Sequence, residues 1–360
     1  MGNILVLGGT GAMGKPLVNI LSNCDNTIYV TSRSKRKDYG NVRYIHGNAQ
    51  DESFIKSILS ERYWDAIVDF MVYSTDRFES RVKSLVESTK QYVFISSCRV
   101  FADKDNIITE RSPRLLDVCT DKEYLQTDEY ALRKAREENI LRKYSNITIV
   151  RPSVTFNKDR LQLGVYEVED WADRAIHGNT IVFSKDIASH ITTMTLGDDV
   201  AVGIAGLIGN PKAFGEDFNI VTSEYYTWRE IFDIYLEVLK SFRLDVKVKV
   251  IDEALNLRIK KWQYQVKYAR LFDRRFDNSK ILDAVPNLEF HNVKESLKKC
   301  LLEYLKNKSN CLTLSSVSIL QDREAGDVAS YSDFANMLSF VKYLVLRFMP
   351  YNLLVKRIEK

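Results

Sequence analysis

The chain has 360 residues, more than one domain of ordinary size needs. Apolar residues make up 45% and charged residues 28%, which is ordinary globular usage. The 52 basic and 48 acidic residues leave a formal net charge of +4, and no run resembles a nucleic-acid-binding arm, so we expect no nucleic-acid partner. Five scattered cysteines without a CxxC pair and four histidines without metal-ligand spacing predict neither disulfides nor a metal site. With no signal peptide at the N-terminus, these features favour a cytoplasmic protein.

Strands alternate with helices through residues 1–151. The expected strands are 3–7, 27–31, 42–46, 66–69, 92–96 and 147–151, and the expected helices are 13–21, 51–60, 78–89 and 128–142. This alternation predicts an α/β fold with a doubly wound parallel sheet, the Rossmann arrangement. After Pro152 the alternation loosens, which predicts a smaller substrate-binding region over 152–306, from which some segments return to the first domain. The polar stretch 307–332 is expected to be a linker, and 333–360 an apolar and basic tail.

A glycine-rich turn follows the first expected strand and opens the first expected helix. Glycines at positions 8, 11 and 14 form a GxxGxxG pattern. Such glycines permit a tight turn, a close approach of the backbone to a pyrophosphate, and close packing of helix on strand. The free N–H groups at the positive end of the helix then bind the pyrophosphate. We therefore predict a dinucleotide site formed by Gly8, Thr10, Gly11, Ala12, Met13 and Gly14.

The end of the second expected strand bears on which dinucleotide binds. An NAD site carries an acid there, about 20 residues past the glycines, to accept the ribose 2′-hydroxyl. Residues 31–36 instead read Thr-Ser-Arg-Ser-Lys-Arg, without a carboxylate, and Arg33 can pair with a 2′-phosphate. We therefore expect NADP, with NAD as the alternative.

Three side chains suited to proton transfer lie in the same half of the chain. Tyr130 and Lys134, four residues apart in the expected helix 128–142, share one helix face. An ammonium group stabilises a nearby phenolate, so Tyr130 can exchange a proton with a substrate oxygen while a hydride moves. Ser97, at the end of the fifth expected strand, can hold the same oxygen. We predict Tyr130, Lys134 and Ser97 as the catalytic set.

The chain resembles the extended short-chain dehydrogenase/reductase family, the NAD-dependent epimerases and dehydratases, over roughly residues 1–305. The matching segments are the glycine turn, residues 94–101 (FISSCRVF), residues 130–134 (YALRK), Arg151-Pro152 and residues 197–201 (GDDVA). The resemblance implies that Ser97, Tyr130 and Lys134 are the catalytic residues and that Lys134 also holds the nicotinamide ribose. Asp198 and Asp199 are expected to cap a helix or anchor a loop.

Departures from the family narrow the expected reaction. Sugar-nucleotide 4,6-dehydratases carry Asp-Glu after the catalytic Thr, whereas this chain has Cys98-Arg99 and lacks the acid and base for eliminating water. Residues 70–74 (FMVYS) replace the usual small residues. We expect an NAD(P)-dependent nucleotide-sugar 4-epimerase or 4-ketoreductase: a tightly held cofactor would favour the epimerase, and the basic loop at Arg33 the reductase. The alternative is a non-catalytic NAD(P)-binding regulatory or RNA-associated relative.

Two further expectations concern assembly. The resemblance implies a homodimer in which helices 78–89 and 128–142 of both subunits form a four-helix bundle. The tail holds fewer apolar residues than the roughly 20 that span a bilayer, so we expect no transmembrane helix. Three explanations of the tail stay open: packing on the body or across the dimer, docking onto a separate partner, and peripheral membrane contact. The last would use Lys342, Arg347, Lys356, Arg357 and Lys360.

Overall fold

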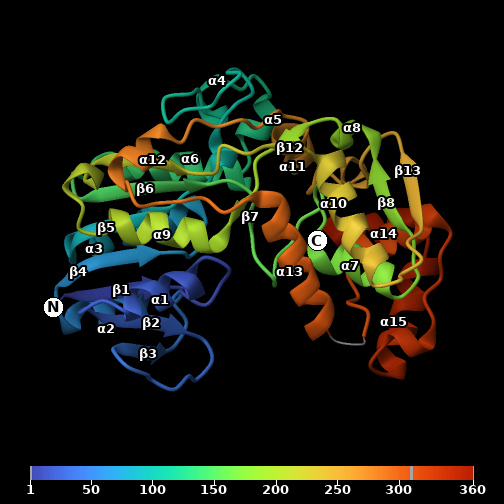
Figure 1. The fold of residues 1–360 in the computed structure, drawn as a ribbon, viewed down its shortest axis with the longest axis horizontal. Helices are drawn as coiled ribbons and strands as arrows, with labels where there is room; N and C mark the ends of the chain where they lie inside the picture. Colours follow the sequence, from blue (N-terminus) through green and yellow to red (C-terminus); the bar gives the residue numbers. More distant parts are fainter. Residues whose placement is uncertain (1, 309–310, 360) are drawn as a thin grey trace. The chain divides into compact units, whose positions relative to one another are not determined.

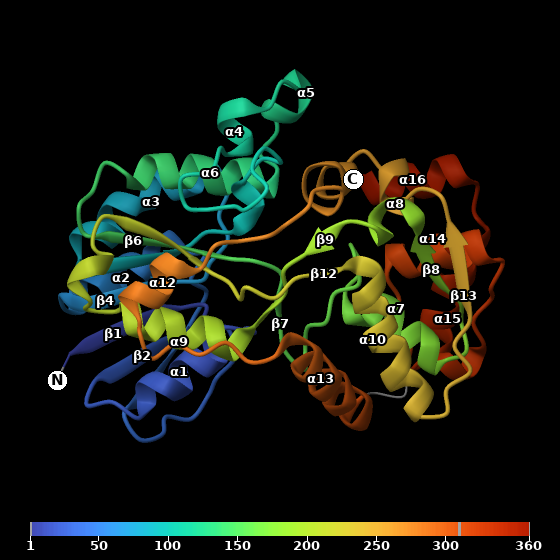
Figure 2. The same ribbon diagram turned by 45° about the horizontal axis from the view of Figure 1, so that its top comes forward.

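The computed structural model describes residues 2–308 and 311–359, and the chain divides into two compact units (Figures 1 and 2). Unit 1 consists of Met1–Thr155, Thr193–Ser223 and Arg275–His291. Unit 2 consists of Phe156–Thr192, Glu224–Arg274 and Asn292–Lys360. Two later segments therefore return to the first unit.

Unit 1 is built on a seven-stranded sheet in the order β11-β6-β5-β4-β1-β2-β3. Its strands are β1 (Asn3–Leu7), β2 (Thr27–Ser32), β3 (Val42–His46), β4 (Trp64–Asp69), β5 (Thr89–Ile95), β6 (Ile147–Pro152) and β11 (Glu216–Ile220). All neighbouring strands run parallel. The predicted doubly wound parallel sheet is confirmed, and β11, which the sequence did not suggest, forms one edge.

Helices cover both faces of this sheet (Figure 1). On one face lie α1 (Gly14–Ser22), α9 (Gly197–Leu207) and α12 (Ser279–Ala284), and on the other α2 (Glu52–Glu61), α3 (Thr75–Glu87) and α6 (Tyr130–Leu141). Ile4 and Val6 of β1 pack on the first face, and Leu5 and Leu7 on the second. Because both faces are buried, the strand reads as a continuous apolar run. The short helices α4 (Leu115–Val118) and α5 (Lys122–Leu125) lie in the connection between β5 and α6.

Unit 2 is mostly helical. Its helices are α7 (Val168–Ile176), α8 (Lys185–Ala188), α10 (Trp228–Ser241), α11 (Gln263–Gln265), α13 (Val293–Asn307), α14 (Ser316–Ala325), α15 (Met337–Phe348) and α16 (Tyr351–Glu359). β8 (Ile181–Ser184) pairs with β13 (Val248–Ile251), and β9 (Ile191–Thr192) with β12 (Tyr226–Thr227). The two-residue strand β10 (Thr195–Leu196) belongs to unit 1, and β7 (Thr155–Phe156) lies where the first segment of unit 1 ends.

The segment 307–332 is not the linker that its polar composition predicts. It contains α14, which begins at a capping Ser315 and ends at Gly326 with a φ of +85°. Arg174 of α7, fully buried, pairs with the buried Asp322 of α14 at 2.7 Å. The tail that follows is also part of unit 2: α15 and α16 contribute Tyr343 and other apolar residues to its core. Buried polar partners and an apolar core together hold this region in place.

Candidate functional site

The turn after β1 depends on its glycines. Gly8 has a φ of +72°, in the left-handed region where other residues are strained. Its N–H donates to Thr31 Oγ1 at 3.1 Å, which fixes the turn to the end of β2. A Cβ on Gly14 would lie 2.6 Å from the backbone of Gly9, so α1 can approach this closely only with glycine there. A Cβ on Gly11 would meet nothing within 4 Å, so this position faces open space.

A cavity of about 350 Å³ opens beside this turn, within unit 1. Gly8, Thr10 and Gly11 line it together with residues 31–33, 47–50 and 70–72. Four of the predicted cofactor residues, Gly8, Thr10, Gly11 and Arg33, therefore surround one cavity at the carboxyl ends of β1, β2, β3 and β4. Ala12, Met13 and Gly14 do not line it, because the chain there turns into α1.

The end of the cavity near β2 is cationic. Arg33 is exposed and forms no ion pair within the described part of the chain. Ser32 Oγ accepts from Arg36 Nε at 3.3 Å, and no carboxylate occurs between residues 31 and 36. An anionic group entering this end would meet the guanidinium of Arg33.

Two serines with different hydrogen-bond partners directly follow the end of β5. Ser96 donates to Glu138 Oε1 at 2.6 Å inside the protein. Ser97 Oγ accepts from the backbone N–H of Arg99 at 3.2 Å and caps a single 3₁₀ turn over Cys98–Val100. Since Ser97 acts as the acceptor in this bond, its own hydroxyl proton remains available for a substrate oxygen.

Tyr130, the first residue of α6, has two guanidinium groups near its ring. The guanidinium carbons of Arg99 and Arg133 are 5.2 and 5.7 Å from its ring centroid. Arg99 also pairs with Glu129 at 2.5 Å. The Tyr130 hydroxyl makes no hydrogen bond to any of the described residues.

Lys134, one turn along α6, is 1% exposed. Its Nζ lies 3.0 Å from Glu137 Oε2 and 4.2 Å from the ring centroid of Phe94. Burial raises the pKa of Glu137, and the ammonium of Lys134 opposes this shift. Nζ nevertheless forms no well-aligned hydrogen bond within the described residues, although it is buried. Lys134 does not line the 350 Å³ cavity, so its contact with a nicotinamide ribose stays a prediction.

Arg151, of the Arg-Pro motif, has a structural role. It donates to both oxygens of Glu138 at 2.7 and 2.8 Å and pairs with Asp217 of β11 at 2.7 Å. Burial alone would raise the pKa of Glu138, but the charge of Arg151 and the Ser96 hydroxyl outweigh it and lower the pKa. This network of ion pairs joins α6 to strands β6 and β11 of the sheet.

Asp199 anchors a loop, one of the two roles expected for the Asp pair. It accepts from the backbone N–H of His291 at 2.9 Å, and its Oδ1 lies 2.5 Å from His291 Nδ1. Both residues belong to unit 1. This contact ties α9 to the returning segment of the chain.

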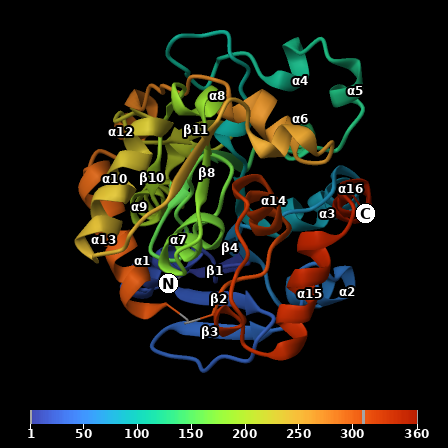
Figure 3. The same ribbon diagram turned by 90° about the vertical axis from the view of Figure 1, so that its right-hand side faces the viewer.

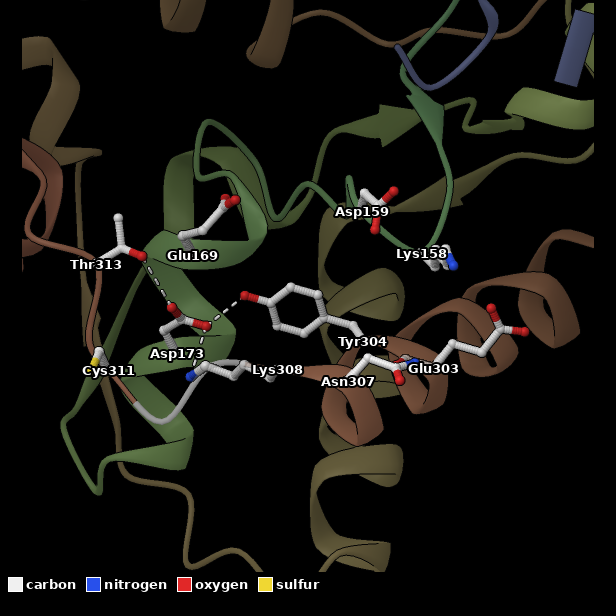
Figure 4. Close-up of a pocket in the computed structure, with 10 residues that line it drawn as sticks. All are labelled: Lys158, Asp159, Glu169, Asp173, Glu303, Tyr304, Asn307, Lys308, Cys311 and Thr313. Atoms are coloured by element: carbon white, nitrogen blue, oxygen red, sulfur yellow. Dashed lines mark hydrogen bonds and ion pairs between the residues drawn. The ribbon is translucent and has the colours of Figure 1, made fainter. Parts of the chain in front are cut away.

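Unit 2 contains a cavity of about 230 Å³ whose polar groups bind one another (Figure 4). Asp173 accepts from Tyr304 at 2.6 Å, pairs with Lys308 at 2.9 Å and accepts from Thr313 at 3.5 Å. These bonds fasten α13 and the segment after it to α7, and we assign no ligand to this cavity. No cluster of His, Cys, Asp and Glu that could hold a metal occurs among residues 2–308 and 311–359.

No protein-family model matches the sequence. One curated relative, the chloroplast stem-loop binding protein of 41 kDa b of Arabidopsis thaliana, is 22% identical over 240 residues. The match covers 62% of this chain and spans about 60% of the length of that relative.

Solved structures match over more of the chain. Epimerase Mth375 from Methanothermobacter thermautotrophicus has a TM-score of 0.67 at 16% identity, covering 85% of this chain and 93% of that one. A dTDP-glucose 4,6-dehydratase from Bacillus anthracis, in complex with NAD, has a TM-score of 0.64 at 16% identity over 85% and 97%. The UDP-N-acetylglucosamine 4-epimerase from Bacillus cereus has a TM-score of 0.63 at 16% identity over 87% and 100%.

This chain has the fold of the NAD-dependent epimerases and dehydratases. The expected resemblance to the short-chain dehydrogenase/reductase proteins is thus confirmed at the level of the fold. Within this epimerase/dehydratase fold, the glycine turn, Ser97, Tyr130 and Lys134 all belong to unit 1.

Sequence reasoning missed several residues of this site. Arg99 and Arg133 were not expected beside Tyr130, nor Glu137 beside Lys134. Residues 47–50 were also missed as cavity lining, although they follow β3 at the sheet edge where α/β sites form. That position was the one signal by which they could have been found.

Proposed function

We propose that the protein is an NAD(P)-dependent nucleotide-sugar 4-epimerase or 4-ketoreductase. The observation that carries the proposal is that unit 1 supplies the glycine-turn cavity at the carboxyl ends of its strands, Ser97 directly after β5, and Tyr130 at the start of α6. The names of structures sharing the fold, a dTDP-glucose dehydratase and a UDP-N-acetylglucosamine epimerase, support a nucleotide sugar as substrate.

The residues present fit a nicotinamide dinucleotide. Gly11 leaves open space where the pyrophosphate would approach the start of α1, and Gly14 lets that helix come close. The buried Nζ of Lys134 keeps hydrogen-bonding capacity that suits a ribose hydroxyl. The exposed Arg33 follows a strand end that has no acidic residue, which supports NADP. A solved structure that shares the fold is in complex with NAD, so NAD remains the alternative.

When bound, the nicotinamide exchanges a hydride with a sugar carbon. Tyr130 removes the proton of the hydroxyl on that carbon, or returns it in the reverse direction. Arg99 and Arg133 lie beside the Tyr130 ring, and Ser97 donates its hydroxyl hydrogen to the same oxygen. Proton transfer at one oxygen is sufficient for both epimerisation and ketone reduction at C4.

Elimination of water is a poor fit to the same residues. The buried Cys98 donates to the backbone oxygen of Arg151 at 3.2 Å, and Arg99 is paired with Glu129. Neither side chain offers the acid and base that a 4,6-dehydratase needs. This supports the epimerase and reductase over the dehydratase.

The test is incubation of the purified full chain with a panel of nucleotide sugars and 4-keto sugars, with NAD and with NADPH, followed by mass spectrometry. Interconversion of 4-epimers with no net change in cofactor would identify an epimerase, and stoichiometric oxidation of NADPH a reductase. Absence of turnover across the panel, with either cofactor, would contradict the proposal.

The second candidate is an RNA-associated protein without catalysis, favoured by the name of the curated relative. The retained Ser97, Tyr130 and Lys134 have no evident use in such a protein. Specific binding of a stem-loop RNA by a chain inactive on the whole panel would support this candidate instead.

Assembly and location also belong to the proposal. A homodimer through α3 and α6 would use an outward face of α3 that carries charged side chains, such as Glu79 and Lys83, and its contacts would therefore be polar. A monomer in light scattering at micromolar concentration would contradict it. None of the five cysteines forms a disulfide within the described residues, which suits a reducing cytoplasm.

A further inference from the structure

The helix α15, drawn in red in Figure 3, exposes a row of apolar side chains. Met337, Leu338, Val341, Val345 and Phe348 are between 46% and 79% exposed. Their spacing places them on one face of the helix, and α15 contains no acidic residue. Soluble proteins rarely expose such a row without a partner for it. We refer to these five side chains as the apolar face of α15.

The opposite side of α15 is fixed to unit 2. Tyr343 and Leu346 are buried in the core of the unit. The Tyr343 hydroxyl accepts from the backbone N–H of Ala329 at 2.8 Å, and Arg347 Nε donates to the backbone oxygen of Asp327 at 2.9 Å. These contacts set the rotation of the helix, so the apolar face is held outward by the fold.

The charge of this region favours an anionic partner. The tail, residues 333–360, contains five basic and two acidic residues and so carries a net charge of +3, against +4 for the whole chain. Lys342 is exposed and neighbours Leu338 and Val345 on the helix surface. Lys356 and Arg357 of α16 are exposed as well. An apolar face with basic residues beside it is the combination that binds anionic lipid.

Two alternatives, a second copy of the chain and a transmembrane span, agree less well with the residues of this face. A second copy of the chain would bring the same basic residues of two tails together, because a two-fold interface pairs one patch with itself. No single helix among the described residues is long and apolar enough to span a bilayer; α15 and α16 reach the length together but meet at a bend of 115°.

We propose that α15 lies along an anionic membrane surface. The apolar face enters the boundary between headgroups and acyl chains, while Lys342, Lys356 and Arg357 contact lipid phosphates. Unit 2 thereby tethers the protein to a membrane through a surface separate from the residues of the proposed reaction, all of which lie in unit 1. The inference does not depend on which sugar the protein converts.

The experiment is flotation of the full chain with vesicles of phosphatidylcholine alone and of phosphatidylcholine with phosphatidylglycerol. We compare the wild type with Leu338→Glu/Phe348→Glu, with Lys342→Glu/Lys356→Glu, and with the control Ile107→Glu. Ile107 is 59% exposed and lies in unit 1, away from the tail in sequence. Melting curves confirm that each variant is folded, and light scattering gives its oligomeric state.

The wild type and the Ile107 variant should float with phosphatidylglycerol vesicles, and added salt should weaken binding. Each tail variant should lower the partition coefficient by about tenfold or more, because it removes two buried apolar side chains or reverses two charges. A wild type that floats with neither vesicle, or an unchanged Leu338/Phe348 variant, would overturn the proposal. If the wild type is dimeric without floating and that variant is monomeric, the occupant is a second copy.

Discussion

Replacing Arg99 by methionine tests whether the cations beside Tyr130 assist proton transfer. The substitution removes a charge 5.2 Å from the Tyr130 ring centroid and keeps much of the apolar length of the side chain. With an effective dielectric constant of about 20, two unit charges at that separation interact by about 3 kcal/mol. Glu129, 2.5 Å from Arg99, opposes most of this effect. We expect a net loss on the order of 1 kcal/mol, or about fivefold in kcat.

Arg133→Met is the comparison for that experiment. Arg133 lies 5.7 Å from the same ring and forms no ion pair within the described residues, but Glu137 interacts with it electrostatically. Its charge is therefore only partly offset, and the loss should be larger than for the Arg99 variant, about tenfold. Two assays apply: kcat on the sugar found by the panel, and the ultraviolet difference titration of each protein against its Tyr130→Phe derivative. The exposed Arg111→Met serves as the control. Wild-type kcat in both arginine variants would refute the electrostatic role.

Further predictions concern the cofactor and stability. Arg33→Ala should weaken NADP binding by roughly 1.5–3 kcal/mol and leave NAD binding unchanged in calorimetry; equal wild-type affinities for the two would contradict the NADP preference. Because Arg151 lowers the folded-state pKa of Glu138, this pair adds stability above the unfolded pKa of about 4.3 and loses it as the pH falls through the folded value. Glu138→Gln should therefore lower Tm at neutral pH and make Tm fall less as the pH is lowered. A fall of Tm with pH equal to that of the wild type would argue against this. Arg174→Met leaves the buried Asp322 without its cation and should lower the free energy of unfolding in urea by about 3–5 kcal/mol, whereas a loss below about 1 kcal/mol would show that α14 is held otherwise.

The sheet of unit 1 could be predicted because its strands are buried on both faces and read as apolar runs. The edge strand β11 was missed because it begins with Glu216 and Asp217, and two adjacent acidic residues are locally typical of a loop. Asp217 belongs in a strand because Arg151, far away in sequence, pairs with it there.

The same reason explains α14. Its buried Gln321 accepts from the backbone N–H of Val182 at 3.1 Å and donates to the backbone oxygen of Asp170 at 2.7 Å. Both partners are more than 130 residues away in sequence, so the polar composition of α14 looked like that of a linker. A polar side chain whose hydrogen-bond partners lie far away in the sequence gives no local sequence sign that it is buried.

Of the candidate site, the sequence predicted the parts that depend on local geometry. The glycine spacing dictates a turn and leaves open space at Gly11, and a strand end without acids places Arg33 at the cavity. The surroundings of Tyr130 and Lys134 depend on rotamers and on the path of the loop after β5, which no spacing rule contains. Of the open explanations of the tail, the structure bears on packing: α15 and α16 pack in the core of unit 2, while docking and membrane contact stay proposals.

The most direct measurement of the central claim compares Tyr130→Phe with the wild type for dinucleotide binding and for turnover. The phenyl ring keeps the packing beside Arg99 and Arg133 but loses the oxygen that carries the proton. We predict nearly unchanged binding of NADPH by fluorescence and a turnover lower by about 10²–10⁴-fold. Wild-type turnover in this variant would contradict the proposed chemistry, and a wild type that binds neither NADPH nor NAD would contradict the assignment of the cavity.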